Sequence, residues 1–387
     1  MSTSAAEDFT GLVAHHNGPD RPPPGWEPGH LVNHETGVAE FTGLATTEAI
    51  DPDEATILAE MRLDAGEWAI KPGTLQVRKW QQKAGSGDEW CWYYRITAVR
   101  RSKTFGDVDD LVAGLRRRKR SAKLSGAPGG QVWATSDWQI GKAGTIEHVL
   151  TTLGELPGRF EASWRRSGKP GAVLVAFGGD LVESCSPHHY GAQQLYSVEM
   201  TDREQRAVVR EAAMAIIDKA STLAETVTVA AVPGNHGEHR IGKRDALVGD
   251  NVDLAAIDDC RWACMGLDAY DHVQWAVPGD DLTVCVELDD LRIGIFHGHQ
   301  VGGQGKVQAW HDKQAGNHRP IGSAQLLLSG HFHSLRCEWL GPRTWVQLPT
   351  EDAGSPQYAE TAGAGARRSG SVTIDVAAGS VGDLRIV

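Results

Sequence analysis

Long apolar runs and closely paired cysteines are both missing from this sequence of 387 residues. No apolar run approaches the ~20 residues that a membrane-spanning helix needs, so we expect no membrane partner. The six cysteines include no CxxC pair, which excludes a dense disulfide framework and predicts reduced thiols. The opening residues, MSTSAAEDFT, lack the basic and apolar regions of a signal peptide. These absences together predict a cytoplasmic protein.

An excess of positive charge is missing as well. Lys and Arg number 38 against 50 Asp and Glu, which gives a net charge of -12 with neutral histidines. This balance excludes a histone-like protein that coats nucleic acid by bulk charge, although it allows a local basic patch. An apolar content of 41% and a charged content of 23% are ordinary for a chain with a sizeable core.

Composition along the chain predicts three parts. Residues 1–35 carry Pro- and Gly-rich turns without apolar periodicity, and we expect a flexible arm there. Residues 36–125 contain strand-like runs at 75–80 and 89–99 separated by a loop, which predicts a hairpin in a small α+β module. Residues 126–387 form the larger domain.

A basic run, Arg116–Arg120, ends a helix expected at 107–120. Such a run is typical of a solvated helix end, where cations suit the helix dipole, which we favour, and a nucleic-acid contact is the alternative. Residues 121–131 contain Gly126-Ala127-Pro128-Gly129-Gly130 and are expected to be a linker.

Strands and helices alternate after this linker. Apolar runs without polar interruption predict strands that are buried on both faces, and longer amphipathic stretches between them predict helices. The pattern indicates an α/β layered sandwich. Strands are expected at 132–135, 172–177, 227–232, 283–288, 291–296, 325–329, 344–348, 371–376 and 383–387, with helices at 145–166 and 198–223.

Polar motifs follow five of these strands, at the carboxyl ends where open α/β sheets build their sites. Each motif alone is compatible with a purely structural role, but five in succession, flanked by glycines, are hard to explain by packing. Carboxylate, amide and imidazole groups together suit divalent ions such as manganese, iron or zinc. The motifs are SDWQIGK from Ser136, GGDLVE from Gly178, PGNHGEH from Pro233, HGH from His297 and GHFH from Gly330.

This order of motifs resembles the calcineurin-like metallophosphoesterase superfamily over roughly residues 131–350. The phrase Thr135-Ser136-Asp137-Trp138, followed by Ile140-Gly141-Lys142, is most similar to the SbcD-type DNA-repair nuclease branch, which has relatives encoded by bacteriophages. The resemblance implies a metallophosphoesterase-type α/β/β/α layered sandwich as the catalytic domain, with the small α+β module on its N-terminal side.

The resemblance also implies two divalent metal ions, for which we expect Mn²⁺, with Fe, Zn or Mg as alternatives. Two ions ~3.5–4 Å apart stabilise an in-line displacement at phosphorus and lower the pKa of a bridging water. By this resemblance Asp137 binds the first ion, Asp180 bridges both, and His333 returns to the first. The full set of expected ligands is Asp137, Gln139, Asp180, Asn235, His297, His331 and His333.

Two further residues receive catalytic roles from the resemblance. His236 corresponds to the histidine that contacts the substrate phosphate and protonates the leaving oxygen, which suits a side chain whose pKa lies near working pH. Glu238 is expected to orient His236 or a metal ligand. Lys142 and Arg240 lie close enough in sequence to contact phosphate, although we favour exposed loop positions for both.

The sequence departs from the family pattern at two positions. Gln139 stands where the family usually has a histidine ligand, and its neutral amide oxygen predicts a weaker first site that prefers manganese or magnesium over zinc. His297 and His299 form a doubled histidine, of which we assign His297 as the ligand and leave His299 as a substrate contact or a spectator.

The leading functional hypothesis is a two-metal phosphoesterase that hydrolyses phosphodiester bonds by attack of a metal-activated hydroxide, with DNA as substrate. One alternative is a phosphodiesterase or phosphomonoesterase acting on small nucleotides or phosphoproteins. Another is a non-catalytic DNA-binding or assembly protein with a vestigial metal site. A homodimer is compatible with the sequence, and no docking segment for the ATPase partner of SbcD-type nucleases is evident.

Overall fold

The computed structural model divides the chain into two compact units, Met1–Thr104 and Phe105–Val387. We describe each unit by itself. The residues that the structure describes are 29–33, 38–46, 53–65, 68–71, 73–84, 87–100, 113–118, 126–184, 198–241, 244–245, 247–352 and 370–387.

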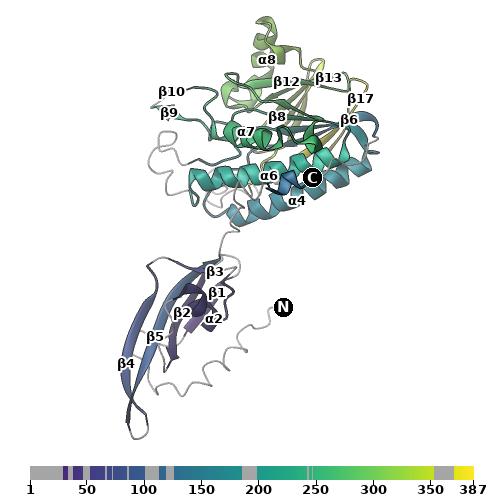
Figure 1. Cartoon of the computed structure of the whole chain (residues 1–387). Helices are drawn as coiled ribbons and strands as arrows, with labels where there is room; N and C mark the ends of the chain where they lie inside the picture. The colour runs from purple at the N-terminus through teal and green to yellow at the C-terminus, as the bar shows by residue number, and fades with distance from the viewer. Residues whose placement is uncertain are drawn as a thin grey trace, which may run out of the picture. The chain divides into compact units, whose positions relative to one another are not determined.

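Over its described residues, the first unit is a five-stranded antiparallel sheet with one short helix (Figure 1). Helix α2 (Glu54–Glu60) begins after Asp53, whose side chain accepts a hydrogen bond from the backbone N–H of Thr56 at 3.2 Å. Its apolar residues pack against the sheet around Phe41 and Ile96. The strands are β1 (Gly29–Asn33), β2 (Val38–Thr46), β3 (Trp68–Ile70), β4 (Gln76–Ala84) and β5 (Gly87–Arg100).

The hairpin predicted in this unit is confirmed, because β4 pairs antiparallel with β5 along its whole length, from Gln76 to Ala84. The expected flexible arm needs a correction, since Gly29–Asn33 pairs with β2 as a strand. The rest of residues 1–35 lies outside the described residues. A five-residue strand such as Gly29–Asn33 is too short to show apolar periodicity of its own, which explains why composition indicated a loop.

Two sheets form the centre of the second unit. The first sheet has β6, β7, β8 and β11 in parallel, while β17 and β18 extend it antiparallel. Its strands, in spatial order, are β11 (Val273–Ala276), β8 (Thr226–Ala231), β7 (Pro170–Phe177), β6 (Ala127–Thr135), β17 (Val372–Ala377) and β18 (Ser380–Ile386).

The second sheet has three parallel strands in its middle and an antiparallel strand at each edge. Its strands, in spatial order, are β12 (Thr283–Leu288), β13 (Leu291–Phe296), β14 (Leu326–Ser329), β16 (Arg343–Gln347) and β15 (Arg336–Leu340). A separate two-residue ribbon joins β9 (Arg240–Ile241) and β10 (Arg244–Asp245).

Helices cover the outer face of each sheet (Figure 1). On the first sheet lie α4 (Ile146–Arg166), α6 (Asp202–Leu223) and α7 (Val252–Cys264), and Trp133 of β6 stacks on Phe160 of α4 with ring centroids 4.9 Å apart. On the second sheet lies α8 (Val307–Gly316), where Trp310 packs on Phe296 at 4.6 Å. None of the described helices is long and apolar enough to cross a membrane.

Between the sheets lies a second apolar layer, built by the alternate residues of the same strands. Val132 and Leu174 of the first sheet pack there against Ile293 and Leu328 of the second. Each central strand therefore buries both of its faces, which is why the strands read as continuous apolar runs. The predicted α/β/β/α layered sandwich and the α+β N-terminal unit are confirmed.

The structure also corrects several element predictions. Strand β6 starts at Ala127, so the second half of the expected linker belongs to the sheet. Helix α6 starts at Asp202 because Thr201 and Glu204 form a capping box. Helix α7, helix α8, β11 and β15 were not predicted, since each is too short to show a clear apolar pattern.

Candidate metal centre

Polar side chains from both sheets meet where the parallel strands end. Asp137 follows β6, Asp180 follows β7 and Asn235 follows β8 in the first sheet. His297 follows β13 and His331 follows β14 in the second. Because the two sheets pack face to face, the carboxyl ends of five strands supply one cluster of ligand-type side chains.

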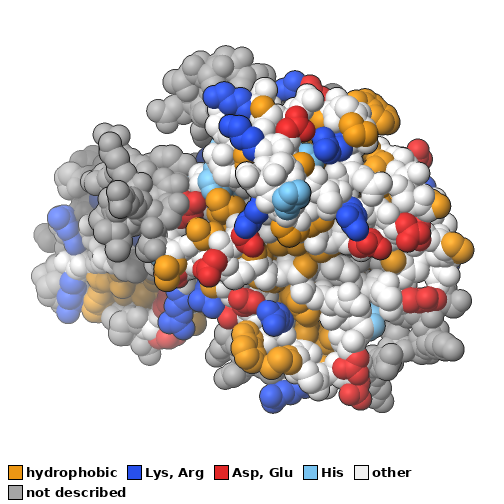
Figure 2. Space-filling view, turned by 90° about the horizontal axis from the view of Figure 1, so that it is seen from above, with side chains coloured by type: hydrophobic (Ala, Val, Ile, Leu, Met, Phe, Trp, Pro, Cys, Tyr) orange, Lys and Arg blue, Asp and Glu red, His pale blue; other side chains and the backbone are white. Residues whose placement is uncertain are grey.

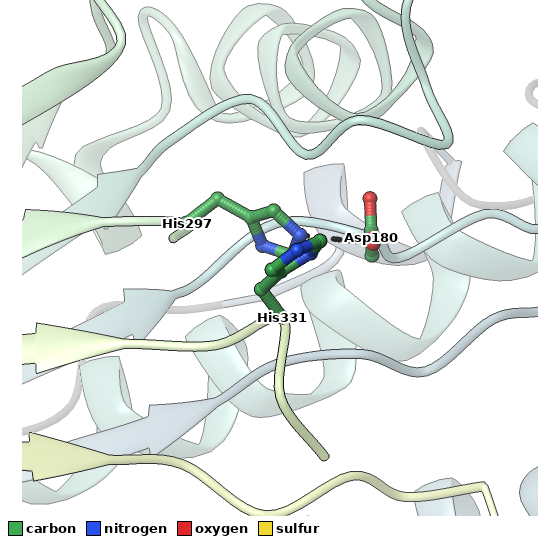
Figure 3. Close-up of side chains that lie close together, drawn as sticks. All are labelled: Asp180, His297 and His331. Carbon is green, nitrogen blue, oxygen red and sulfur yellow. Dashed lines mark ion pairs between the residues drawn. The ribbon is translucent and has the colours of Figure 1, made fainter. Parts of the chain in front are cut away.

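Asp180, His297 and His331 form the tightest part of this cluster, with ligand atoms that all lie within 4.8 Å of one another. Figure 3 shows the two imidazole rings beside each other and facing the carboxylate. His297 Nε2 lies 2.9 Å from Asp180 Oδ2 and 3.1 Å from Asn235 Oδ1. We call Asp180, Asn235, His297 and His331 the Asp180 group.

The donor set of the Asp180 group fits a divalent cation. His297 Nδ1 lies 2.7 Å from the carbonyl oxygen of Gly178, to which it donates its proton, so Nε2 is the nitrogen that a cation beside Asp180 would bind once its own proton is released. Carboxylate, amide oxygen and imidazole are together the ligands that transition ions such as Mn²⁺, Fe²⁺ and Zn²⁺ accept. His297 is fully buried and Asp180 is 1% exposed, so a cation would neutralise a carboxylate that water does not reach.

The pKa values of this group follow from its charges. Burial by itself would raise the pKa of Asp180, but the positive charge of His297 and His236 outweighs it and the pKa is lowered. Burial would lower the pKa of His297, but the carboxylates of Asp180 and Asp137 raise it to about 9. A proton thus occupies the place that a cation would take, and the two would compete for the same lone pair.

His331 behaves differently from His297. Its burial and the charge of His297 lower its pKa to about 4. The ring is therefore neutral at physiological pH and offers a lone pair without first releasing a proton.

A second set of residues, Asp137, Gln139 and His333, lies beside the first, and we call it the Asp137 group. His333 Nε2 is 3.2 Å from Asp137 Oδ1, and Gln139 Nε2 is 3.4 Å from His333 Nε2. The two groups are linked through the backbone, since Gln139 N–H donates to the carbonyl oxygen of Asp180 at 3.0 Å.

The backbone of both groups is held in an uncommon conformation. Asp137, Asp180 and His331 all have positive φ values, at 53°, 51° and 73°, and Gln139 and His333 share this left-handed region at 47° and 54°. Residues other than glycine adopt it rarely, and it concentrates at functional sites. The conformation turns each strand end sharply, which directs the side chain into the cluster instead of along the sheet.

Two glycines allow the loops that carry these residues to pack closely against one another. A Cβ on Gly234 would lie 2.0 Å from the backbone nitrogen of Asp180, and a Cβ on Gly330 would lie 2.0 Å from Ser136 Oγ. Any other residue at either position would push apart the loops that carry Asp180 and Asp137.

Asp253 is a buried residue that sequence reasoning missed. Its carboxylate accepts backbone hydrogen bonds from Asp180, Leu181, Val182 and Gly234, at 2.9, 3.0, 3.1 and 3.1 Å. It thereby ties the turn after β7 to the turn after β8. The signal lay in Asn251-Val252-Asp253, because Asn251 caps α7 and places Asp253 in its first turn.

His236 lies beside Asp180 and is partly open to solvent. Its backbone N–H donates to Asp180 Oδ1 at 2.8 Å, and its ring Nε2 lies 3.8 Å from Asp180 Oδ2. Nδ1 lies 3.1 Å from the carbonyl oxygen of Glu183 and 3.3 Å from its Oε2 atom. Burial would lower the pKa of His236, but the carboxylates of Asp180 and Glu183 raise it to about 10.

Glu238 lies against a different histidine, with Oε1 at 3.3 Å from His299 Nε2. The carboxylate found beside His236 is Glu183, for which the sequence analysis gave no role. Its position three residues after Asp180 in the same motif could have indicated it. The ring of His299 lies 6.3 Å from that of His331, centroid to centroid, so His299 borders the Asp180 group.

No protein-family model and no curated protein matches this chain. The solved structures similar to it include Vps29 with Zn²⁺ from Entamoeba histolytica, at 15% identity and a TM-score of 0.32, covering 66% of this chain and 97% of that one. An archaeal phosphodiesterase has 13% identity and a TM-score of 0.32, covering 66% and 99%.

Purple acid phosphatase PPD1 from yellow lupin is similar at 10% identity and a TM-score of 0.32, covering 90% of this chain and 71% of that one. Likeness at this level assigns neither family nor activity, so the function must follow from the side-chain geometry itself.

Proposed function

We propose that this chain is a metal-dependent phosphoesterase that hydrolyses phosphodiester bonds, with DNA as the expected substrate. The carrying observation is the meeting of the Asp180 group with His236 around one carboxylate. Asp180 accepts the backbone N–H of His236 and contacts the ring of His297, so a cation site and a protonated imidazole share one residue.

In this proposal Asp180, Asn235, His297 and His331 hold one divalent ion, and Asp137 and His333 contribute to a second position next to it. Bound divalent ions supply positive charge that stabilises the negative oxygens of a phosphate ester and lower the pKa of water. Mn²⁺ is the ion that we expect, since mixed oxygen and nitrogen ligands suit it.

His236 is proposed to donate a proton to the leaving oxygen. Its raised pKa keeps the ring protonated at neutral pH, and Nδ1 is directed at Glu183, while Nε2 lies on the side of the cluster, 3.8 Å from Asp180 Oδ2. Its side chain is 13% exposed, so a phosphate ester can reach it. A positioned acid of this kind contributes about 10²–10⁴-fold to the rate.

The surface charges bear on the choice of substrate. The basic run was one reason to expect DNA, but Arg118 forms an ion pair with Asp218 of α6, and the side chains of Lys119 and Arg120 lie outside the described residues. On the face shown in Figure 2, the described Lys and Arg side chains are interspersed with Asp and Glu. This favours a small phosphodiester as the second candidate substrate.

A substrate panel with added Mn²⁺ tests the proposal. The full chain is assayed on single-stranded DNA, duplex DNA, RNA, a cyclic nucleotide, a phosphopeptide and bis-para-nitrophenyl phosphate. We expect DNA cleavage that chelation abolishes and that His236→Ala lowers about 10²–10⁴-fold. His272→Ala is the matched control, because His272 contacts the carbonyl oxygen of Ser221, away from the cluster.

The outcomes separate the candidates. Cleavage of the small diester without cleavage of DNA would replace the nuclease by a small-nucleotide phosphodiesterase. Release of phosphate from the phosphopeptide alone would indicate a phosphatase. A chain that cleaves nothing with any added metal would contradict the proposal and leave a non-catalytic role.

A further inference from the structure

The side chain of Gln139 lies between two polar neighbours that fix its orientation. Its amide oxygen Oε1 accepts a hydrogen bond from Lys142 Nζ at 2.9 Å. Its amide nitrogen Nε2 lies 3.4 Å from His333 Nε2. The NH₂ end of the amide therefore faces the Asp137 group, and the oxygen faces Lys142.

An amide ligates a divalent cation through its oxygen, because the NH₂ group has no lone pair to offer. For Gln139 to act as a ligand, the amide would have to turn over and release Lys142. The ammonium group, within hydrogen-bond distance of the same oxygen, would also repel a cation placed there.

Lys142 is itself held in place by Asp352. The two side chains form an ion pair in which the Lys142 side chain is 21% exposed and that of Asp352 1%. The backbone N–H of Asp352 donates to Thr350 Oγ1 at 3.0 Å, and Thr350 Oγ1 donates to the carbonyl oxygen of Asp137 at 2.7 Å. The segment that carries Asp352 is thereby fastened to the loop that carries Asp137.

From this arrangement we infer that Lys142 and Asp352 are positioning residues that keep the oxygen of Gln139 away from the Asp137 group. Gln139 is then not a metal ligand, and the Asp137 group offers only Asp137 and His333 besides the shared Asp180. The Asp180 group is the single high-affinity site, and the neighbouring position binds a divalent ion weakly and exchangeably. This inference rests on the proposed function, since it concerns the same cluster.

The weaker first metal site expected from Gln139 thus has a different physical reason: the amide oxygen is not available as a ligand, so its strength as a ligand does not matter. A histidine could reach a cation with a ring nitrogen whatever Lys142 does, whereas an amide has only one ligand atom. Where that atom is already taken by an ammonium group, the loss of the histidine removes a ligand outright.

Mn²⁺ titration calorimetry on the metal-stripped full chain tests the inference without any activity assay. We expect one tight ion per chain and a second that binds at least about tenfold more weakly, a difference of about 1.4 kcal/mol. Gln139→Ala should change the affinity of the second ion by less than about twofold, because removing a side chain that is not a ligand removes no bond to the ion.

The double variant Lys142→Met/Asp352→Asn removes both charges of the pair and so leaves no unpaired charge buried. It frees the amide oxygen, and we expect the second ion to bind at least about tenfold more tightly. Adding Gln139→Ala to this double variant should abolish the gain. Lys219→Met, which breaks the ion pair with Glu161 between α4 and α6, is the control and should leave both affinities unchanged.

Different results would contradict different proposals. Two equally tight ions in the unaltered chain, or a weaker second ion in Gln139→Ala alone, would overturn this inference and leave the proposed function intact. A double variant that folds, as its circular dichroism would show, but gains no affinity would overturn it as well. A chain that binds no Mn²⁺ would overturn both.

Discussion

The Asp180 group and the Asp137 group draw on the same kinds of side chain but direct their donor atoms differently. In the Asp180 group, His297 Nε2 lies against both the Asp180 carboxylate and Asn235 Oδ1, so the atoms that would hold an ion face one another. In the Asp137 group, an NH₂ group faces the histidine while the matching oxygen faces a lysine. Residue types at strand ends are therefore not enough to define a metal site; the second neighbours of each ligand decide where its lone pair lies.

The two groups also differ in the hydrogen bonds that hold their loops in place. Asp253 holds the loops of the Asp180 group through four backbone hydrogen bonds. The Asp137 group is fastened by the segment from Thr350 to Asp352, which contains the buried carboxyl of Glu351. Four substitutions would break or sharpen the comparison, in order of expected effect.

Asp180→Asn should have the largest effect, because it removes the buried negative charge at the centre of the Asp180 group. We expect the affinity for Mn²⁺ to fall at least about 100-fold and phosphodiester hydrolysis to fall with it. Calorimetry and the substrate assay measure the two losses. Asp258→Asn, a partly exposed carboxylate of α7, should change neither. Unaltered Mn²⁺ affinity in Asp180→Asn would mean that the ions bind elsewhere.

Asp253→Asn should destabilise the second unit by about 4 kcal/mol. One carboxylate oxygen becomes an NH₂ group, so two of the four backbone donors lose their acceptor, at ~1–3 kcal/mol each. Urea denaturation measures the loss, again with Asp258→Asn beside it. If the stability is unchanged but Mn²⁺ affinity falls, Asp253 positions the Asp180 group without supporting the fold.

Glu351→Gln should change how stability depends on pH. Burial raises the pKa of Glu351 to about 7 from 4.5, against the opposing hydrogen bond from Ser371. Between these values the unfolded chain releases the proton and the folded chain keeps it, so stability falls as pH rises from about 4.5 to 7 and is level above. At about 1.4 kcal/mol per pH unit, the whole fall is about 3 kcal/mol.

The variant lacks the titrating proton, so it should be about 2–3 kcal/mol more stable than the unaltered chain at pH 8 and closely similar at pH 4.5. Thermal denaturation across this pH range measures the difference. Glu147→Gln, an exposed position on α4, should follow the unaltered chain. A parallel pH dependence in Glu351→Gln would show that this carboxyl ionises freely in the folded state.

Glu183→Gln should have the smallest effect, on the pH profile alone. Glu183 helps to raise the pKa of His236, so its loss lowers that pKa. Because a general acid works protonated, the alkaline fall in activity should move to lower pH, with a roughly 3- to 10-fold lower rate at pH 9. Nuclear magnetic resonance titration of His236 checks the pKa directly, with Glu155→Gln on α4 as control. An unchanged pH profile would show that Glu183 does not determine the pKa of His236.

Much of the fold could be read from the chain because the strongest signals are local. The continuous apolar runs predicted the central strands of both sheets, and long amphipathic periods predicted α4 and α6. Short elements such as α7 and β15 were missed, since thirteen or five residues carry too little periodicity to stand out from their surroundings.

The sequence by itself determined which side chains lie at the strand ends, because a motif that follows a parallel strand must lie at the carboxyl edge of its sheet. Only the tertiary structure decided which atoms face one another there. Lys142 and Asp352 are 210 positions apart, and His236 meets Glu183 across 53. Such contacts depend on how the two sheets pack and how each loop turns, and neither local spacing nor residue type contains that information.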